Sequence, residues 1–444
     1  MNITLVTCTL TIDQRWAVGA VAGAHDETDL PVARDPRAGG QAWIPATSLV
    51  GSLRPHLGEA AAHMWLGSAM RDYEDAPSGK DRGSTVQAGR LRVLGTRPIQ
   101  ASPMSRGTTA VNRARGAADA RMLRTEESVE PTEVTLLMEY DGASDTALLN
   151  LLASWRPVIG RGRSSGLGAA RVSEVSSVTL DLTHPEHLTW WLGERTAYLL
   201  GSGGLPHGLE RQRPTTKPSE NPAGPSEDDL VVAMTAAEPI HIGVGDSAEK
   251  VTPLLRGKEN TPYIPGSSWK GVFRHRVEFI LDVVGATDVQ SDGIVTALFG
   301  SQEAGRGLLT FGDSMIEAIQ TQPRTHVAID RFTGGARDGS LFTLDSVPRR
   351  STFTLHIGGA AAIGPVENLL NHVIRDLSEG LIGVGGHGSR GYGWVARSED
   401  PPALGAVDVP ALHAALVPQP PQQPPQAGAA QAALTPGPHQ EVIA

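Results

Sequence analysis

The chain divides into two halves, and each half begins with a run of apolar and β-branched residues in the pattern of a strand. The runs "ITLVTCTLTI" at 3–12 and "LVVAMTAAEPIHI" at 230–242 therefore predict β-strands. Each is followed by helically spaced apolar residues after an Ile-Pro turn, and later by a second helical pattern, at 147–155 or 365–377. A glycine-rich loop and a final strand pattern close each half. Both halves thus predict the strand–helix–strand–strand–helix–strand order of a ferredoxin-like fold, in the α+β class.

The two halves also share short phrases. "WIPATSLVGSLR" at 43–54 corresponds to "YIPGSSWKGVFR" at 263–274, and "GRGRSSGLGAARV" at 160–172 to "GVGGHGSRGYGWV" at 383–395. Five such matches occur in the same order, with an offset between 218 and 233 residues. A repeated order at a nearly constant offset predicts a tandem duplication of one domain type.

Two segments lack the apolar residues needed to offset the entropy of ordering. One is 202–228, rich in Pro, Gly and Ser, and the other is 399–444, rich in Pro, Gln and Ala. We interpret the first as a linker and the second as a disordered tail. They bound a first domain at 1–201, which ends in an extra helix at 185–200, and a second domain at 229–398.

Composition narrows the class of protein. The single cysteine, Cys8, lies in an apolar run and allows no disulfide within the chain, which favours a reducing cytoplasm. The absence of any run of eighteen apolar residues predicts that the chain does not span a membrane. A net charge of −10 argues against a protein that coats nucleic acid through its whole surface, so binding would be confined to local basic clusters.

The first motif is the turn after Ile-Pro in each half. Its hydroxyl groups and backbone N–H groups can cap a helix or bind a phosphate, and the retained arginine favours phosphate. A plain capped helix is the alternative for either copy. The residues predicted to bind RNA phosphate here are Thr47, Ser48 and Arg54 in the first half, and Ser267, Ser268, Lys270 and Arg274 in the second.

The second motif is the glycine-rich loop before the last strand. Glycines allow close backbone approach and arginines supply a fork for phosphate, although a structural glycine hairpin is a common alternative. The candidate RNA-binding residues are Arg161, Arg163, Gly166 and Gly168 in the first half, and Arg390, Gly391 and Gly393 in the second.

A third motif predicts a long projecting hairpin in each half, at 110–129 and 328–347. Arg113 and Arg331 are its candidate RNA contacts, and a surface excursion without a role is the alternative. A fourth, in the first half only, is the acidic loop "HDETDLPVARDP" at 25–36. Its carboxylates could position hydrated Mg²⁺ or act as a base, or simply form a solvated acidic loop.

Together these motifs resemble the RAMP superfamily of CRISPR-associated proteins, and especially the backbone subunits of type III effector complexes. The likeness rests on the glycine-rich loop, on "YIPGSSWKG", and on "AIDRFTG" followed by "SVP", and it covers about 9–172 and 230–395. It implies two RRM-like domains with thumb hairpins, which bind a CRISPR guide RNA and its complementary target RNA beside other effector subunits. The repeated phrase would then reflect two covalently joined backbone units.

The resemblance also implies chemistry. Target-cutting members carry an Asp two residues before a Pro, as in "DLPVARDP", which makes Asp29 the catalytic residue and the ligand of Mg²⁺ or another divalent cation. RNA supplies its own nucleophile, the 2′-hydroxyl, so cleavage needs in-line geometry, proton transfer and charge stabilisation. In the second half Val251 stands two residues before Pro253, so we expect that half to bind RNA without cutting, with Asp246 as a fallback.

Three alternatives stay open. The chain could be a scaffold that binds guide RNA without cutting, a guide-processing endoribonuclease of the same superfamily, or a tandem RNA-binding protein with no chemistry outside CRISPR systems. The thumb segment in both halves argues against the processing enzyme. Target-cleavage assays separate the first alternative from the cutting subunit.

Overall fold

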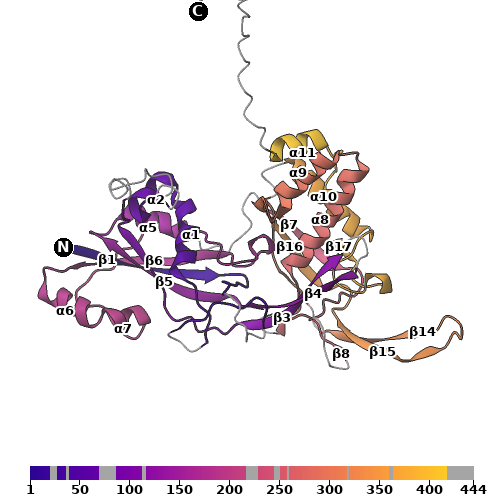
Figure 1. Cartoon of the computed structure of the whole chain (residues 1–444), viewed down its shortest axis with the longest axis horizontal. Coiled ribbons are helices and arrows are strands. Elements are labelled where there is room, and N and C mark those ends of the chain that lie inside the picture. The colour runs from indigo at the N-terminus through magenta and orange to yellow at the C-terminus, as the bar shows by residue number, and fades with distance from the viewer. Residues whose placement is uncertain are drawn as a thin grey trace, which may run out of the picture.

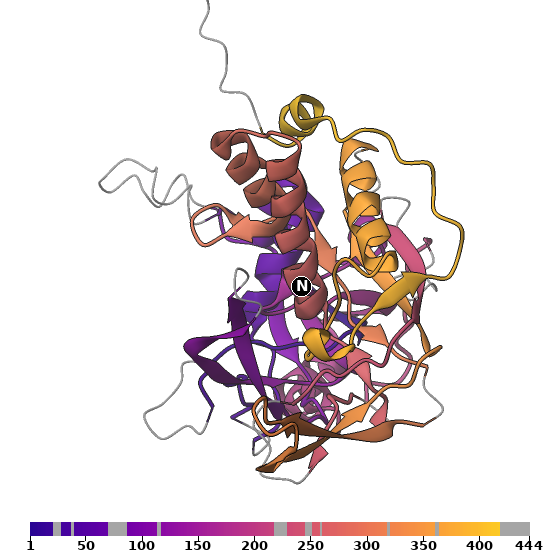
Figure 2. The ribbon, with the colours of Figure 1, turned by 90° about the vertical axis from the view of Figure 1, so that its right-hand side faces the viewer.

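The computed structural model describes residues 1–20, 28–36, 40–69, 87–112, 117–216, 229–244, 251–257, 260–317, 320–359 and 364–417, with the backbone only for 110–112 and 117–122. Figure 1 shows two lobes, one built from each half of the chain. The arrangement is seen end-on in Figure 2. The mixed helix and strand content confirms the α+β class.

The first half forms a four-stranded antiparallel sheet with the order β2-β5-β1-β6. This order, with helices connecting the first to the second strand and the third to the fourth, is that of a ferredoxin-like fold. The strands are β1 (Asn2–Ile12), β2 (Leu91–Thr96), β5 (Thr132–Asp141) and β6 (Ala170–Asp181), and the helices on one face are α1 (Ala46–Leu57), α2 (Glu59–Leu66) and α5 (Thr146–Ala153).

Alternation along β1 places helices on both faces of this sheet. Val6 packs in the core beneath α1 and α5, whereas its neighbour Leu5 packs against Trp190 and Tyr198. Those two aromatics come from α6 (Pro185–Gly193) and α7 (Arg195–Leu200), which lie on the opposite side of the sheet in Figure 1. The extra helix expected at 185–200 is therefore two short helices packed on the first domain.

The second half repeats this topology with shorter strands. The order β12-β16-β7-β17 is again antiparallel throughout. The strands are β7 (Leu230–Ala236), β12 (Thr310–Phe311), β16 (Thr352–Gly358) and β17 (Val395–Arg397), and the helices are α8 (Gly266–Val283), α9 (Asp288–Phe299), α10 (Gly364–Ser378) and α11 (Val409–Leu416). The core is centred on aromatic side chains of α8, α9 and β12, among them Trp269, Phe273, Phe299 and Phe311.

A long hairpin leaves each half at the same point of the fold. The first comprises β3 (Met104–Asn112) and β4 (Ala117–Ser128), and it runs between the two lobes. The second comprises β14 (Gln322–Ile329) and β15 (Ala336–Ser346), and it projects away from the molecule. At its tip the side chain of Phe332 is 99 % exposed.

Short strands and turns complete the fold and carry parts of the site. They are β8 (Val251–Thr252), β9 (Tyr263–Ile264), β10 (Gly300–Ser301), β11 (Gly305–Arg306) and β13 (Ser314–Met315), with 3₁₀ turns η1 (Arg163–Ser165) and η3 (Gly388–Arg390) in the two glycine-rich loops.

The first part of each segment that the sequence predicted to be unstructured is ordered. Residues 202–216 stay on the first half, where Gln212 pairs with Ser177 and the side chain of Asn150 bonds Thr215. In the tail, α11 packs on α9, with Val409 and Leu412 buried. A few apolar and capping residues suffice to order these two segments, because each segment packs on a surface that is already formed. Residues 217–228 and 418–444 lie outside the described residues.

Within the described part of the chain, none of the helices combines the length and apolar character needed to cross a bilayer.

Candidate functional site

The two halves meet where the glycine-rich loop of the first docks on the start of α8 in the second. The ammonium group of Lys270 donates a 2.8 Å hydrogen bond to Ser164 Oγ in that loop. A Cβ on Gly266 would clash with the carbonyl oxygen of Phe311 and lie 2.5 Å from that of Ser165. The Ile-Pro turn of one half and the glycine-rich loop of the other therefore form a single structure, and glycine is required at their contact.

A buried ion pair joins the halves at this point. The guanidinium of Arg15 donates from Nε and Nη2 to Oδ2 of Asp313, at 3.0 and 2.9 Å, and both side chains are 3 % exposed. The other oxygen, Oδ1, accepts the backbone N–H of Gly266 at 2.8 Å. A carboxylate at a helix N-terminus is favoured by the partial positive charge there.

This contact corrects the expected helix caps. The N-cap residues of α1 and α8 are Pro45 and Pro265, and neither proline side chain accepts a hydrogen bond from its helix. Asp313 takes over the first N–H group of α8 instead of Ser268. Proline at the N-cap offers no side-chain acceptor, so the acceptor comes from a distant segment.

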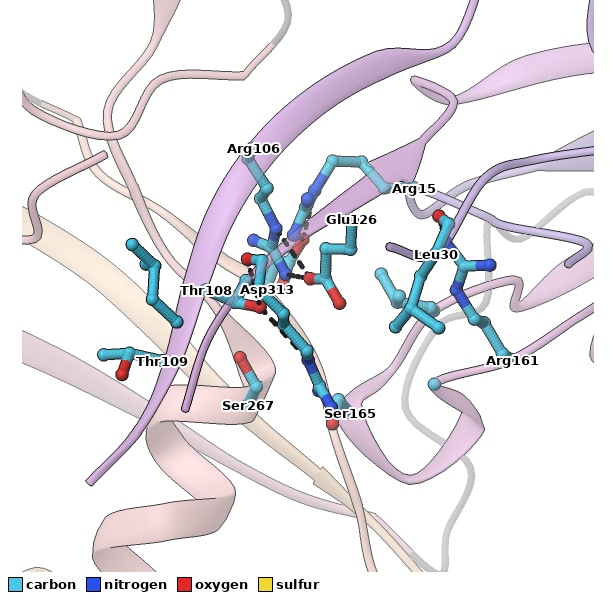
Figure 3. Close-up of a pocket in the computed structure, with 14 residues that line it drawn as sticks. Arg15, Leu30, Arg106, Thr108, Thr109, Glu126, Arg161, Ser165, Ser267 and Asp313 are labelled. Carbon is cyan, nitrogen blue, oxygen red and sulfur yellow. Dashed lines mark hydrogen bonds and ion pairs between the residues drawn. The ribbon is translucent and has the colours of Figure 1, made fainter. Parts of the chain in front are cut away.

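Beside the ion pair lies a polar pocket of about 400 Å³, shown in Figure 3. Both halves of the chain line it, together with the base of the first hairpin. Four arginines outnumber two carboxylates among its lining residues, so the pocket favours an anionic ligand. The lining residues are Arg15, Leu30, Arg106, Thr108, Thr109, Leu123, Arg124, Glu126, Arg161, Gly162, Ser165, Leu167, Ser267 and Asp313.

The arginines of this pocket are held in place by defined partners. Arg106 bonds Glu126 at 2.9 Å through Nε and Tyr263 at 3.4 Å through Nη1, and Arg15 lies over the Tyr263 ring. Burial raises the pKa of Tyr263, with a smaller contribution from Asp313, while the two arginines oppose the rise. Tyr263 thus stays a neutral phenol beside Arg15 and Arg106, each of which is also paired with a carboxylate.

Asp29 directly precedes Leu30, which lines the pocket, on a segment that pairs with β4. Leu30 forms a parallel bridge with Glu126. The exposed carboxylate of Asp29 accepts the N–H of Thr125 at 2.7 Å and its hydroxyl at 3.1 Å, both at Oδ2. Arg161 fixes the same segment, because it donates to the carbonyl oxygens of Leu30, Pro31 and Glu127 at 2.6–3.0 Å.

The second half has an equivalent segment without the carboxylate. β8 pairs in parallel with β15, with Val251 opposite Thr343. The first residue pair of the hairpin is Met104 with Ser128 in the first half and Gln322 with Ser346 in the second. Thr125 and Thr343 each lie three residues before that serine, so they occupy equivalent positions. Val251 therefore stands where Asp29 stands in the first half, as the sequence comparison indicated. Asp246 lies outside the described residues.

The structure gives several predicted contacts an internal partner. Arg54 donates to the carbonyl oxygens of Gly67 and Leu66 at the end of α2, and Arg274 pairs with Glu278 at 3.0 Å. Arg163 donates to the carbonyl oxygen of Gly160, and Arg390 lies 2.6 Å from His387. These bonds orient the side chains, and their role in RNA binding stays a prediction.

The remaining candidates fall into three groups. Thr47 and Ser48 lie at the start of α1, Ser267 and Ser268 at the start of α8, and Arg331 in the exposed turn of the second hairpin. Gly168 and Gly393 are required by close backbone contacts, with the carbonyl oxygens of Ile159 and Val384, while Gly166 packs on Phe311 and Gly391 faces open space. Arg113 lies outside the described residues.

The fit of a divalent cation rests on one carboxylate. No group of three His, Cys, Asp or Glu side chains suited to a metal ion occurs among the residues that the structure describes. Mg²⁺ often binds through one or two carboxylates, with water and substrate phosphate completing the shell. Asp29 fits that arrangement only as a single protein ligand, so a cation here would depend on the RNA itself.

Sequence reasoning named Arg161 and Ser267 but missed the other charged residues that line the pocket. Arg15, Arg106 and Asp313 belong to none of the four motifs, and Arg124 and Glu126 lie in the third motif without having been singled out. The alternation of charge along β4, with Arg124 and Glu126 two residues apart, is a signal that both point to one face. Nothing local indicates that Arg15 and Asp313, 298 positions apart, form a pair.

Two ferredoxin-like sheets joined through an arginine-lined pocket define an α+β protein suited to binding a polyanion. The comparison with protein families gives the more particular result: residues 234–396 match the model of the RAMP superfamily. The match runs from β7 into β17 and contains the second hairpin and the second glycine-rich loop. The matched segment covers less than half of the chain, so it makes the second half similar to that superfamily. A comparison with curated proteins finds no match.

Proposed function

We propose that this chain is a backbone subunit of a type III CRISPR effector complex, in which two RAMP domains arose by duplication and were joined in one polypeptide. The family match over 234–396 and the equal strand order of the two sheets support this proposal. In it, the hairpins β3–β4 and β14–β15 act as thumbs beside guide RNA and target RNA. The polar pocket beside the Arg15–Asp313 ion pair, which has more arginines than carboxylates, binds the RNA phosphate backbone next to the hairpin β3–β4.

We further propose that the first half cleaves the target RNA at Asp29. The 2′-hydroxyl attacks the neighbouring phosphorus, the bond to the 5′-oxygen breaks, and that oxygen takes a proton from water, which gives a 2′,3′-cyclic phosphate and a 5′-hydroxyl. Asp29 would accept the proton of the 2′-hydroxyl, and the pocket arginines would stabilise the charge that develops on the phosphate. A divalent cation bound to Asp29 and phosphate would add Lewis-acid stabilisation.

The observation that supports this assignment is the fixed position of Asp29, next to the pocket-lining residue Leu30. Its segment is tied to β4 by two backbone and side-chain bonds from Thr125 and is braced by Arg161. A carboxylate needed only for solubility would not require such support. A scaffold without cleavage is the second candidate, favoured by the lack of a three-ligand metal group in the described residues.

The test is cleavage of an end-labelled target RNA by the complex assembled with guide RNA and Mg²⁺. Asp29→Asn keeps the size of the side chain and can still accept from Thr125, yet it lacks the negative charge. We expect cleavage to slow by about 100-fold or more, the usual contribution of a proton-transfer group, with target binding unchanged. The control is Val251→Ala at the equivalent position, which should cut as the wild type does. Equal cutting by Asp29→Asn would exclude Asp29 from the reaction, and no cutting by the wild-type complex would favour the scaffold.

A further inference from the structure

The second half carries an aromatic and imidazole cluster where the first half has its pocket. The two glycine-rich loops correspond position by position: Gly160 and Gly385 approach the carbonyl oxygens of Ala17 and His241, and the 3₁₀ turns η1 and η3 follow three residues later. On this basis His387 replaces Gly162 and Tyr392 replaces Leu167. The hairpin registers place His326 and Phe342 at the positions of Thr108 and Arg124.

These four side chains form one connected group at the base of the projecting hairpin. His326 stacks on Phe342 with ring centroids 5.3 Å apart and an interplanar angle of 20°. Phe342 stacks in turn on His387, at 6.4 Å and 28°. His326 Nε2 lies 2.7 Å from the hydroxyl group of Tyr392. The outcome is a row of parallel rings where the first half has small and polar side chains.

A guanidinium group completes the cluster. Arg390 Nη1 donates to Nδ1 of His387 at 2.6 Å, and its central carbon lies 5.0 Å from the centroid of Phe342. Arg390 is exposed, and His387 and Phe342 are partly exposed. The cluster therefore presents a charged fork and ring surface together at the protein surface.

The backbone at His387 shows that its imidazole is retained at a cost. Its φ is +61°, in the left-handed region that side chains with a Cβ rarely adopt, and the equivalent Gly162 has a φ of +72°. The same loop shape is thus available with glycine and without strain. Strain of this kind persists where the side chain serves a purpose.

The surface of this loop is also open. In the first loop Gly166 packs on the carbonyl oxygen of Phe311, whereas around Gly388 and Gly391 no described atom lies within 4 Å of an added Cβ. Exposed glycine backbone next to arginine allows a phosphate to approach closely. Rings and guanidinium planes stack on any nucleobase and so favour single-stranded nucleic acid.

We propose that this cluster binds one splayed-out nucleotide of single-stranded RNA, with the base stacked on His387 at the end of the row, which Phe342 supports from within, and with its phosphate held by Arg390. The assignment rests on the proposed RNA-binding function and deepens it. It gives the second half a role distinct from that of the first: it holds a base and has no carboxylate for cleavage.

The test is binding of the full-length chain to a fluorescein-labelled single-stranded RNA, and to the same RNA with abasic sites. His387→Gly installs the residue of the first loop, and Phe342→Leu keeps an apolar side chain. Each should weaken binding of the intact RNA by about tenfold, the usual effect of losing a stacked base. Neither should change binding of the abasic RNA. His387→Gly should also leave the thermal midpoint unchanged or raise it, which separates lost binding from lost folding.

The outcomes are distinct from those that test the proposed function. RNA binding by the wild type that both variants retain would overturn the base-binding site alone. Equal weakening for intact and abasic RNA would overturn stacking in favour of a phosphate contact. Unchanged RNA binding with a loss of self-association in the variants would make the loop a docking surface for a second copy. No binding of RNA by the wild type would overturn both proposals.

Discussion

Single residues separate the two halves more clearly than their folds do. Asp29 corresponds to Val251, and Gly162 to His387, within segments whose backbone pairing is otherwise the same. Asp29 has a carboxylate where Val251 is apolar, and His387 has an imidazole where Gly162 has no side chain. Under the two proposals, halves with the same strand order divide cleavage and base binding between them through single side chains.

The position of His387 predicts a pH dependence of stability. Burial lowers the pKa of His387 from its ordinary value of 6.5, and the neighbouring His241, Arg390 and His326 lower it further. Above 6.5 both the folded and the unfolded chain are neutral at this site. Below 6.5 the unfolded chain takes up a proton first, so the free energy of unfolding falls as the pH decreases towards the lowered pKa.

We expect the urea midpoint of the wild type to fall more between pH 7.5 and pH 5.5 than that of His387→Gly. The other titrating groups, Tyr392 included, are common to both proteins, so the difference isolates the imidazole. Parallel midpoints across this range would contradict the prediction.

Cys8 predicts a second measurable property of one residue. Its side chain is fully buried in β1, and burial raises the pKa of the thiol well above its usual range. Because the thiolate is the reactive form, native Cys8 should resist iodoacetamide at pH 8 and react fully once urea unfolds the chain. Mass spectrometry of the alkylated protein measures this. Rapid labelling under native conditions would show that β1 opens locally.

At the scale of elements, the segment before the Ile-Pro turn pairs in parallel with the second strand of each hairpin. In the second half this segment is the short strand β8 with Val251, and in the first half it is an isolated bridge at Leu30, next to Asp29. The sequence predicted the hairpins and the correspondence of these two residues. It could not predict the parallel pairing, because a two-residue strand has no periodicity of its own.

The shared register predicts that cleavage can be transferred. Val251→Asp places a carboxylate opposite Thr343, where Asp29 lies opposite Thr125 in the first half. In the assembled complex with Mg²⁺ we expect a second cleavage product, offset from the first and slower, since the pocket arginines of the first half are not reproduced. Val251→Asn, which lacks the charge, should give the wild-type pattern, and so should Val251→Asp if position 251 does not face the RNA.

At the scale of the whole molecule, the strand order of both sheets followed from hydrophobic periodicity and the internal repeat. The Ile-Pro turns and glycine-rich loops were also recognised in each half. What the sequence could not show is that the loop of one half docks on the turn of the other. That contact depends on a lysine–serine bond and on the pairing of Arg15 with Asp313, which local patterns do not encode.

Breaking that ion pair should loosen the two halves. Arg15→Ala leaves Asp313 buried without its cation, a change that typically costs about 3–5 kcal/mol. We expect the urea midpoint of full-length Arg15→Ala to be lower than that of the wild type, and its unfolding to separate into two transitions. The matched control is Arg349→Ala, whose 3.0 Å pair with Glu238 is 60 % and 28 % exposed and should contribute less than about 1 kcal/mol. Equal shifts in the two variants would mean that the buried pair does not hold the junction.

The pocket draws its walls from both halves, with Arg15 on one side and Ser267 and Asp313 on the other. Docking of the halves and occupation of the pocket are consequently linked equilibria. A ligand that binds only the docked arrangement must strengthen docking by as much as docking strengthens its own binding. Mutations at the junction that touch no nucleotide would then still appear as weaker affinity, and a bound polyanion would restore cooperative unfolding to a chain with a damaged junction.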